Sequence, residues 1–87
     1  MPEIVMYTGR VCPYCTRAKA ILAKKGVEYR EEMVDLDPNG REKLVELTGR
    51  RTVPQILIDG EPIGGFDELS ALDRSGELDA KLGLASS

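Results

Sequence analysis

Both cysteines of this 87-residue chain lie in one short stretch, Cys12-Pro13-Tyr14-Cys15, and the residues around this stretch constrain the local fold. Before it, Ile4-Val5-Met6-Tyr7 is a continuous apolar run, which favours a strand buried on both faces. Pro13 is favoured at the first position of a helix, where its missing N–H leaves no hydrogen bond unmade. Apolar residues then recur at helical spacing until Lys24-Lys25-Gly26, a typical helix end. The cysteine pair is therefore predicted at the junction of a buried strand and a helix.

The segment after this helix predicts a second strand and a second helix. Residues 27–36 mix apolar with charged side chains, a composition that suits the edge of a sheet. Strand, helix and strand in this order imply a right-handed crossover that leaves the two strands parallel. We expect Asp37 to cap the second helix, Pro38 to be its first residue and Gly49 to end it.

The second half of the chain begins with a hairpin signal. Asp59-Gly60 separates Gln55-Ile56-Leu57-Ile58 from Glu61-Pro62-Ile63-Gly64, and Asp-Gly between two such runs favours a tight hairpin turn. Pro62 cannot donate a ladder hydrogen bond, so the last strand is expected at a sheet edge.

A third helix is expected after Gly64-Gly65, with Leu69, Leu72 and Leu78 on its apolar face, and residues 83–87 are expected to fray. The predicted order is β-α-β-α-β-β-α. It describes an α/β fold: a four-stranded mixed sheet, with two parallel and two antiparallel strands, flanked by three or more helices. At 87 residues we expect one domain, spanning residues 1–87.

Composition narrows the function classes. A net charge of −3 argues against a nucleic-acid partner, for which a basic domain is expected. The first residues have no basic region, and no run approaches the roughly 20 apolar residues of a membrane span. Two cysteines and no histidine supply half of a tetrahedral zinc site, so we expect no bound metal. We expect a cytoplasmic monomer without membrane or nucleic-acid partners.

The cysteine pair has the features that thiol–disulfide exchange needs. Cys12 at a helix N-terminus is expected to be a stabilised thiolate, since such positions lower a thiol pKa to about 3.5–7.5. Cys15, one turn deeper, lies within the Cα separation of about 4.4–6.8 Å that a disulfide allows. We therefore expect Cys12 to be the nucleophile and Cys15 the resolving thiol. Two ordinary core cysteines are the alternative, but these would not explain Pro13.

Three motifs of the chain, at their spacing, resemble a dithiol glutaredoxin of the thioredoxin superfamily: Cys12-Pro13-Tyr14-Cys15, Thr52-Val53-Pro54 and Gly64-Gly65-Phe66-Asp67. The resemblance covers essentially the whole chain. Cys-Pro-Tyr-Cys is far more specific than Cys-x-x-Cys, and thioredoxins typically carry Cys-Gly-Pro-Cys instead. The resemblance implies a thioredoxin-like fold and a glutathione-dependent thiol–disulfide oxidoreductase, with glutathione as co-substrate and no permanently bound cofactor.

The resemblance also implies where glutathione binds. Pro54 would be a cis-proline facing the cysteines, and Val53 would pair its backbone with the cysteinyl part of glutathione, as an added strand does. Gly65 would let the backbone approach the ligand, and the Phe66 amide and the Asp67 carboxylate would hold the γ-glutamyl end. The predicted glutathione site comprises Arg10, Tyr14, Arg51, Thr52, Val53, Pro54, Gly65, Phe66 and Asp67.

Plainer interpretations of these residues stay open. Read alone, Pro54 begins a strand, Gly64-Gly65 forms a turn and Asp67 caps a helix. Tyr14 either fills the surface between the cysteines or forms the floor of a substrate groove.

The chain departs from the family pattern at Gly9, where glutaredoxins usually carry a lysine. Arg10 is either an ordinary surface charge or a replacement for that cation, together with Arg51 or Arg50 across the groove. Phe66 stands where many relatives have cysteine and would widen the apolar rim.

The leading hypothesis is an enzyme that reduces protein–glutathione mixed disulfides through Cys12 alone, and protein disulfides through Cys12 and Cys15. Its partners would be glutathione, glutathionylated or disulfide-bearing proteins such as ribonucleotide reductase, and, indirectly, glutathione reductase. A second hypothesis is an iron–sulfur carrier that uses one Cys12 from each of two chains and two glutathione thiolates. A third is a thioredoxin-like reductant supplied by a flavoprotein reductase.

Overall fold

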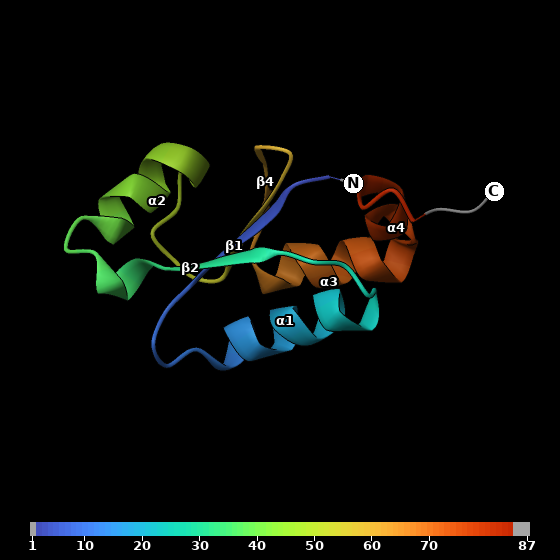
Figure 1. The fold of residues 1–87 in the computed structure, drawn as a ribbon, viewed down its shortest axis with the longest axis horizontal. Coiled ribbons are helices and arrows are strands. Elements are labelled where there is room, and N and C mark those ends of the chain that lie inside the picture. The colour runs from blue at the N-terminus through green and yellow to red at the C-terminus, as the bar shows by residue number, and fades with distance from the viewer. Residues whose placement is uncertain (1, 85–87) are drawn as a thin grey trace.

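The four strands form one mixed sheet in the order β2-β1-β3-β4 (Figure 1). The computed structural model describes residues 2–84. Its strands are β1 (Ile4–Thr8), β2 (Arg30–Met33), β3 (Gln55–Ile58) and β4 (Glu61–Gly64). β1 pairs in parallel with β2 and antiparallel with β3, and β3 pairs antiparallel with β4. The predicted mixed sheet is therefore confirmed, with the charged strand β2 and the proline-bearing strand β4 at its two edges.

Helices cover both faces of this sheet. They are α1 (Pro13–Lys24), α2 (Gly40–Thr48), α3 (Phe66–Ser75), the short α4 (Glu77–Lys81) and the single 3-10 turn η1 (Val34–Leu36). In Figure 1, α1 and α3 lie side by side on one face, and α2 lies on the other. None of the helices within residues 2–84 is long and apolar enough to cross a membrane.

The main core lies between the sheet and the α1–α3 layer. Met6 of β1 and Ile56 of β3 are fully buried there, against Leu22 of α1 and Leu69 of α3. Alternation along each strand sends the neighbouring side chains to the opposite face. The core also contains Ile4, Ala18, Val27, Ile58, Leu78 and Leu82. This packing anchors β1 and α1, and so fixes the loop that joins them.

The second helix begins later than predicted. Asp37 and Pro38 belong to a turn, in which the Asp37 Oδ1 accepts from the Asn39 amide at 2.9 Å and the Asp37 carbonyl accepts from the Gly40 amide at 2.9 Å. The helix starts at Gly40, whose absent side chain leaves room for the carbonyl oxygen of Val34. The predicted helix cap at Asp37 is therefore wrong, because Asp37-Pro38-Asn39 forms a turn instead.

Two further elements differ from the sequence prediction. The second strand is only Arg30–Met33, because the chain turns into η1 at Val34. The third helix ends at Gly76, whose φ of 85° is left-handed, and Leu78 is buried from the separate helix α4. The predicted fraying of the tail lies outside the described residues from residue 85 onward.

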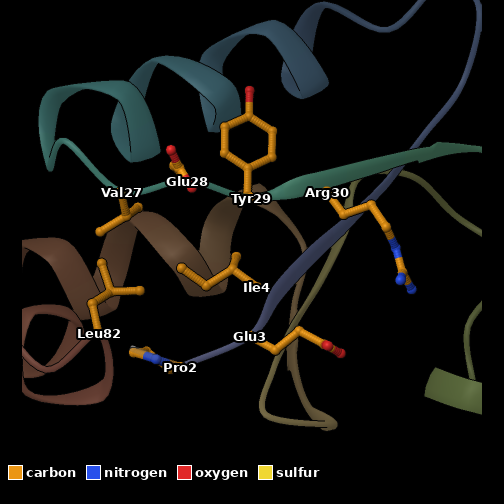
Figure 2. Close-up of a pocket in the computed structure, with 8 residues that line it drawn as sticks. All are labelled: Pro2, Glu3, Ile4, Val27, Glu28, Tyr29, Arg30 and Leu82. Carbon is orange, nitrogen blue, oxygen red and sulfur yellow. The ribbon is translucent and has the colours of Figure 1, made fainter.

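A broad depression of about 510 Å³ lies at the end of the sheet where β1 begins (Figure 2). Its lining comes from the chain entering β1, the segment entering β2, and the residue that follows α4. These residues are Pro2, Glu3, Ile4, Val27, Glu28, Tyr29, Arg30 and Leu82. It lies where β1 begins, whereas the cysteines follow the other end of β1, so its size does not make it the site of thiol chemistry.

Candidate active site

Cys12 caps the N-terminus of α1. Its backbone is extended, Pro13 is the first helical residue, and its Sγ accepts a hydrogen bond from the Cys15 amide at 3.1 Å. A free amide aimed at the sulfur stabilises negative charge there, as the positive end of the helix dipole also does. The local sequence thus places the Cys12 sulfur at the N-terminus of a helix, as Cys-Pro-Tyr-Cys predicted.

Cys12 and Cys15 form a disulfide, with their Cα atoms 5.1 Å apart. The two residues differ in exposure: Cys12 is partly exposed, whereas Cys15 is buried at 3%. An external reagent can therefore reach Cys12 far more easily than Cys15.

The loop between α2 and β3 forms the wall opposite Cys12. The Val53–Pro54 peptide bond is cis, as the resemblance implied. The Cys12 Sγ lies 3.7 Å from the carbonyl oxygen of Val53. The backbone of Val53 therefore faces the disulfide directly.

The start of α3 forms a third wall. A Cβ on Gly65 would lie 3.1 Å from the Pro54 carbonyl oxygen, and one on Gly64, where φ is 118°, would lie 2.6 Å from Glu68 Oε1. The glycine pair therefore allows α3 to begin close against the cis-proline loop. Glu68 Oε1 accepts from the Gly65 amide at 2.7 Å, which leaves the amides of the next residues at the helix start beside the pocket.

The Val53–Pro54 loop, the start of α3 and Tyr14 enclose a pocket of about 260 Å³, whose lining includes neither cysteine. Its aromatic side is made by Tyr14 and Phe66, whose ring centroids lie 5.7 Å apart, and the guanidinium of Arg17 stands 5.5 Å from the Tyr14 ring centroid. Tyr14 thus contributes to the pocket wall. The predicted residues that line the pocket are Tyr14, Thr52, Val53, Pro54, Gly65, Phe66 and Asp67.

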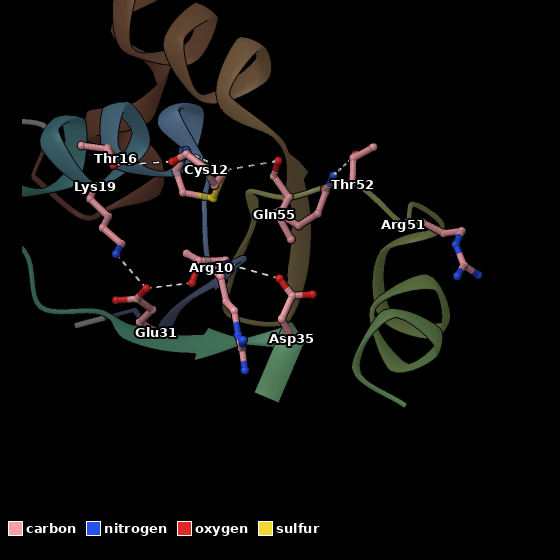
Figure 3. Close-up of a disulfide and its surroundings, with 12 residues drawn as sticks. Arg10, Cys12, Thr16, Lys19, Glu31, Asp35, Arg51, Thr52 and Gln55 are labelled. Atoms are coloured by element: carbon pink, nitrogen blue, oxygen red, sulfur yellow. Dashed lines mark hydrogen bonds and ion pairs between the residues drawn. A yellow bond between two sulfur atoms is a disulfide. The ribbon is translucent and has the colours of Figure 1, made fainter. Parts of the chain in front are cut away.

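Arg10 and Arg51 were also predicted in the site, but they do not line this pocket. Figure 3 shows both side chains pointing away from Cys12. Their backbones, instead, are held by neighbouring polar groups. The Arg10 amide donates to Asp35 Oδ2 at 3.1 Å, and the Arg51 carbonyl accepts from Arg41 Nη1 at 2.8 Å.

Three polar residues line the pocket beyond those predicted. Sequence reasoning placed Arg50 only as an alternative to Arg51, and it did not identify Gln55 or Glu68. Gln55, at 1% exposure, donates from Nε2 to Thr52 Oγ1 at 3.2 Å and supports the loop from within. A glutamate three residues after a helix cap is a known sequence signal of a helix start. It could identify Glu68 only if the start of α3 at Phe66 was already known.

Hydrogen bonds shift the pKa of two carboxyls around the site. The Gly65 amide, together with the Arg50 guanidinium at 3.0 Å, lowers the pKa of Glu68. The Arg10 amide and, in addition, the Arg41 guanidinium lower the pKa of Asp35. Both groups are therefore carboxylates at neutral pH.

An exposed sulfur at a helix start, a buried partner and a facing cis-proline loop can exchange disulfides with an external molecule. On this mixed sheet, these features define a thiol–disulfide oxidoreductase with a thioredoxin-like fold.

The chain belongs to the glutaredoxin family, whose sequence profile matches residues 4–63. It is 49% identical over 82 residues to glutaredoxin 3 of Escherichia coli strain K12, covering 94% of this chain and 99% of that protein. The solution structure of glutaredoxin from Brucella melitensis matches it with a TM-score of 0.85 at 42% identity, covering 100% of this chain and 95% of that one.

A crystal structure of a buckwheat glutaredoxin–glutathione complex is also similar. It matches with a TM-score of 0.86 at 32% identity, covering 94% of this chain and 77% of that one. The protein is therefore an oxidoreductase, and its redox-active group is the Cys12–Cys15 dithiol.

Proposed function

We propose that the protein reduces protein–glutathione mixed disulfides and protein disulfides, with glutathione as the electron donor. One observation carries the proposal: the sulfur of the partly exposed Cys12 lies 3.7 Å from the carbonyl of Val53, which lines a pocket large enough for part of a small peptide. The similarity to a glutaredoxin that was crystallised with glutathione supports this choice of donor.

For a glutathionylated client, Cys12 alone suffices. The Cys12 thiolate attacks the glutathione sulfur, a Cys12–glutathione disulfide forms, and the client leaves as a thiolate that takes up a proton. The thiolate of a second glutathione attacks the bound glutathione sulfur. This step releases oxidised glutathione and restores the Cys12 thiolate. One half of the oxidised glutathione is the client's former adduct, so each turnover consumes one free glutathione.

For a client disulfide, both cysteines take part. Cys12 attacks one client sulfur and expels the other, which forms a mixed disulfide. The Cys15 thiol then loses its proton, attacks the Cys12 sulfur and expels the client as a dithiol. The product is the Cys12–Cys15 disulfide, the state described here. Two glutathione molecules return it to the dithiol.

We place glutathione along the pocket beside the disulfide. Its cysteinyl part pairs with the Val53 backbone next to Pro54, and its γ-glutamyl carboxylate meets the free amides at the start of α3. Asp67 then faces the ammonium group, and Tyr14 and Phe66 cover the apolar part of the ligand. Thr52 borders the same pocket, whereas Arg10 and Arg51 do not line it.

The wider setting follows from this chemistry. We propose that residues 1–87 form a single domain that works as a monomer in the cytoplasm, where glutathione reductase regenerates the donor. Its clients are proteins that carry disulfides or glutathione adducts, with ribonucleotide reductase as one candidate.

The division of roles between the two cysteines predicts a split between two activities. Cys15→Ser keeps the removal of glutathione from a glutathionylated peptide and loses the reduction of a peptide disulfide. Cys12→Ser loses both, because it removes the attacking sulfur. Parallel assays of the two substrates check this, and equal loss of both activities in Cys15→Ser contradicts the assigned roles.

The electron donor is tested by its source. The oxidised protein is mixed with one of two reducing systems, and NADPH consumption is followed in each. The first system is glutathione with glutathione reductase, and the second is thioredoxin reductase alone. We expect turnover with the first system only. Turnover with thioredoxin reductase alone indicates instead a thioredoxin-like reductant.

A further inference from the structure

Asp35 lies between the loop that precedes the cysteines and the start of α2 (Figure 3). Its Oδ2 accepts from the Arg10 amide at 3.1 Å, and its Oδ1 accepts from Arg41 Nη2 at 3.2 Å. The other terminal nitrogen of Arg41, Nη1, donates to the Arg51 carbonyl at 2.8 Å. The planar fork of one guanidinium thus joins a carboxylate to a backbone carbonyl. We call Asp35 and Arg41 the Asp35–Arg41 bridge.

The two ends of this bridge lead to the two groups that face each other in the active site. Arg10 stands two residues before Cys12, and Arg51 stands two residues before Val53. The Cys12 sulfur and the Val53 carbonyl oxygen are 3.7 Å apart. The bridge therefore closes a ring that contains this contact, and its length sets how the two loops lie relative to each other.

Gly9 provides the space that the bridge occupies. A Cβ at this position would lie 3.1 Å from Asp35 Oδ2, 3.2 Å from Val53 Cγ2 and 3.5 Å from Arg41 Nη2. Contacts of 3.1–3.2 Å to a Cβ would push both the carboxylate and Val53 outward. The glycine at position 9 thus fits closely with the approach of Asp35.

We propose that Asp35 and Arg41 are positioning residues that hold the Cys12 loop against the Val53–Pro54 loop for thiol–disulfide exchange. The inference rests on the proposed function, because Val53 matters only if a ligand pairs with it beside the sulfur. Sulfur attack demands alignment, and a displacement of about 1 Å can reduce a reaction rate about 100-fold. Charge-assisted hydrogen bonds are strong enough to hold two short loops in register.

The chain supplies a matched control in the Asp37–Lys43 pair. Its residues are also six apart and come from the same two segments, with Lys43 Nζ 2.6 Å from Asp37 Oδ2. Both pairs are solvent-exposed, and Asp37 also has a lowered pKa, first through Lys43. The control pair, however, contacts neither the Arg10 amide nor the Arg51 carbonyl.

The test compares Asp35→Asn, Arg41→Gln and their double variant with Asp37→Asn and Lys43→Gln. We expect kcat/KM toward a glutathionylated peptide to fall about 10- to 100-fold in the bridge variants and to stay near the wild-type value in the controls. Asp35→Asn leaves the Arg41 charge in place, so its loss of activity is not the loss of a cation. The double variant should lose little more than the worse single variant, since each breaks the same bridge.

A second readout separates positioning from general damage. Alkylation of reduced Cys12 by iodoacetamide needs a thiolate but no Val53 contact, so we expect its rate and pH profile to stay near those of the wild type. Far-UV circular dichroism and Tm report folding. If Asp35→Asn does not fold, Gly9→Ala crowds the bridge while keeping its groups, and reduced kcat/KM supports the proposal.

The proposal is overturned if the bridge variants or Gly9→Ala have the same kcat/KM as the control variants. It is also overturned if a bridge variant loses turnover and the alkylation rate of Cys12 to the same extent. Strictly additive losses in the double variant overturn it as well. These results leave an active wild-type protein and so spare the proposed function. A wild-type protein that does not use glutathione overturns the proposed function before any variant is compared.

Discussion

At the scale of single residues, position in one helical turn makes the two sulfurs unequal. Cys12 caps α1 and takes the Cys15 amide on its sulfur, whereas Cys15 is buried at 3% under the same turn. Partial exposure lets an external molecule reach the first sulfur, and burial shields the second. The unequal roles proposed for the cysteines follow from this difference of one turn.

Asp67 gives a residue-scale prediction about the donor. It is exposed at the start of α3 and lines the pocket, where we place the glutathione ammonium. An exposed ion pair is worth about 0.2–1 kcal/mol, so Asp67→Asn should raise KM for glutathione by about 1.5- to 5-fold. Steady-state kinetics with varied glutathione measures the change.

The matched control is Glu77→Gln, which removes an acid from the first turn of α4, outside the pocket. We expect its KM to stay at the wild-type value. A change of KM in the control equal to that in Asp67→Asn argues against a direct contact.

At the scale of elements, ion pairs fasten the end of α1 to the C-terminal helices. Lys25 Nζ lies 2.9 Å from Asp73 of α3 and 2.7 Å from Asp79 of α4, and the Lys25 side chain is only 16% exposed. Its pKa is raised, chiefly by the hydrogen bond with Asp73, and the pKa of Asp73 is lowered chiefly by Lys25. The helix that carries the cysteines is thereby tied to the helix that borders the pocket.

This cluster predicts a stability change that depends on pH. Because the pKa of Asp73 is depressed on folding, its contribution is complete above the unfolded value, about 3.9, and is lost as pH falls below it. Asp73→Asn should therefore lower Tm by about 1–8 °C at pH 7, with a smaller difference from wild type near pH 3. Thermal unfolding followed by circular dichroism at both pH values checks this.

Glu32→Gln is the comparison, since Glu32 pairs with Arg30 on the edge strand with both side chains about half exposed. We expect Glu32→Gln to change Tm less than Asp73→Asn does at both pH values. A difference between Asp73→Asn and wild type that is as large near pH 3 as at pH 7 contradicts the role of the carboxylate.

At the scale of the whole molecule, charge is unevenly distributed despite the net −3. Within residues 2–84, side-chain ion pairs join most cations to carboxylates, but Arg10, Arg17, Arg51 and Arg74 make none. The first three come from the segments around the cysteines and the Val53 loop. Glu3 and Glu28, in contrast, lie at the opposite end of the sheet. Among the charged groups without an ion pair, the reactive end therefore has more cations than carboxylates, with Asp67 of the pocket as the carboxylate.

This polarity predicts faster reduction of anionic clients. With the reduced protein and no glutathione, a disulfide peptide with acidic flanks should react faster than one with basic flanks. The advantage should shrink as ionic strength rises past about 0.1 M, where the Debye length is about 10 Å. Stopped-flow measurement of both peptides over a salt series checks this.

Arg17→Gln, beside Tyr14, should reduce the rate with the acidic peptide by about 1.5- to 5-fold. Arg74→Gln removes an equally unpaired charge at the end of α3 and should change it less. Equal effects of the two variants contradict steering by the reactive end.

Much of the fold and the site could be predicted because the signals are local. Apolar runs, Pro13 beside Cys12, and Asp59-Gly60 between two strands each set nearby backbone geometry through sterics or hydrogen bonding. The mixed sheet was predicted from the order of these elements. Local rules failed where two mechanisms compete, as at Asp37-Pro38, where a turn formed in place of a helix start.

The sequence by itself determined the dithiol, its place at a helix start and the order of strands and helices along the chain, because these depend on neighbours a few residues away. Only the tertiary structure decided that Gln55 and Glu68 line the pocket and that Asp35 reaches the Arg10 amide, 25 positions earlier in the chain. Such contacts depend on how separate segments pack, and residue type alone carries little information about contacts between residues far apart in the sequence. The unusual Gly9 is informative only once Asp35 and Val53 are seen on either side of it.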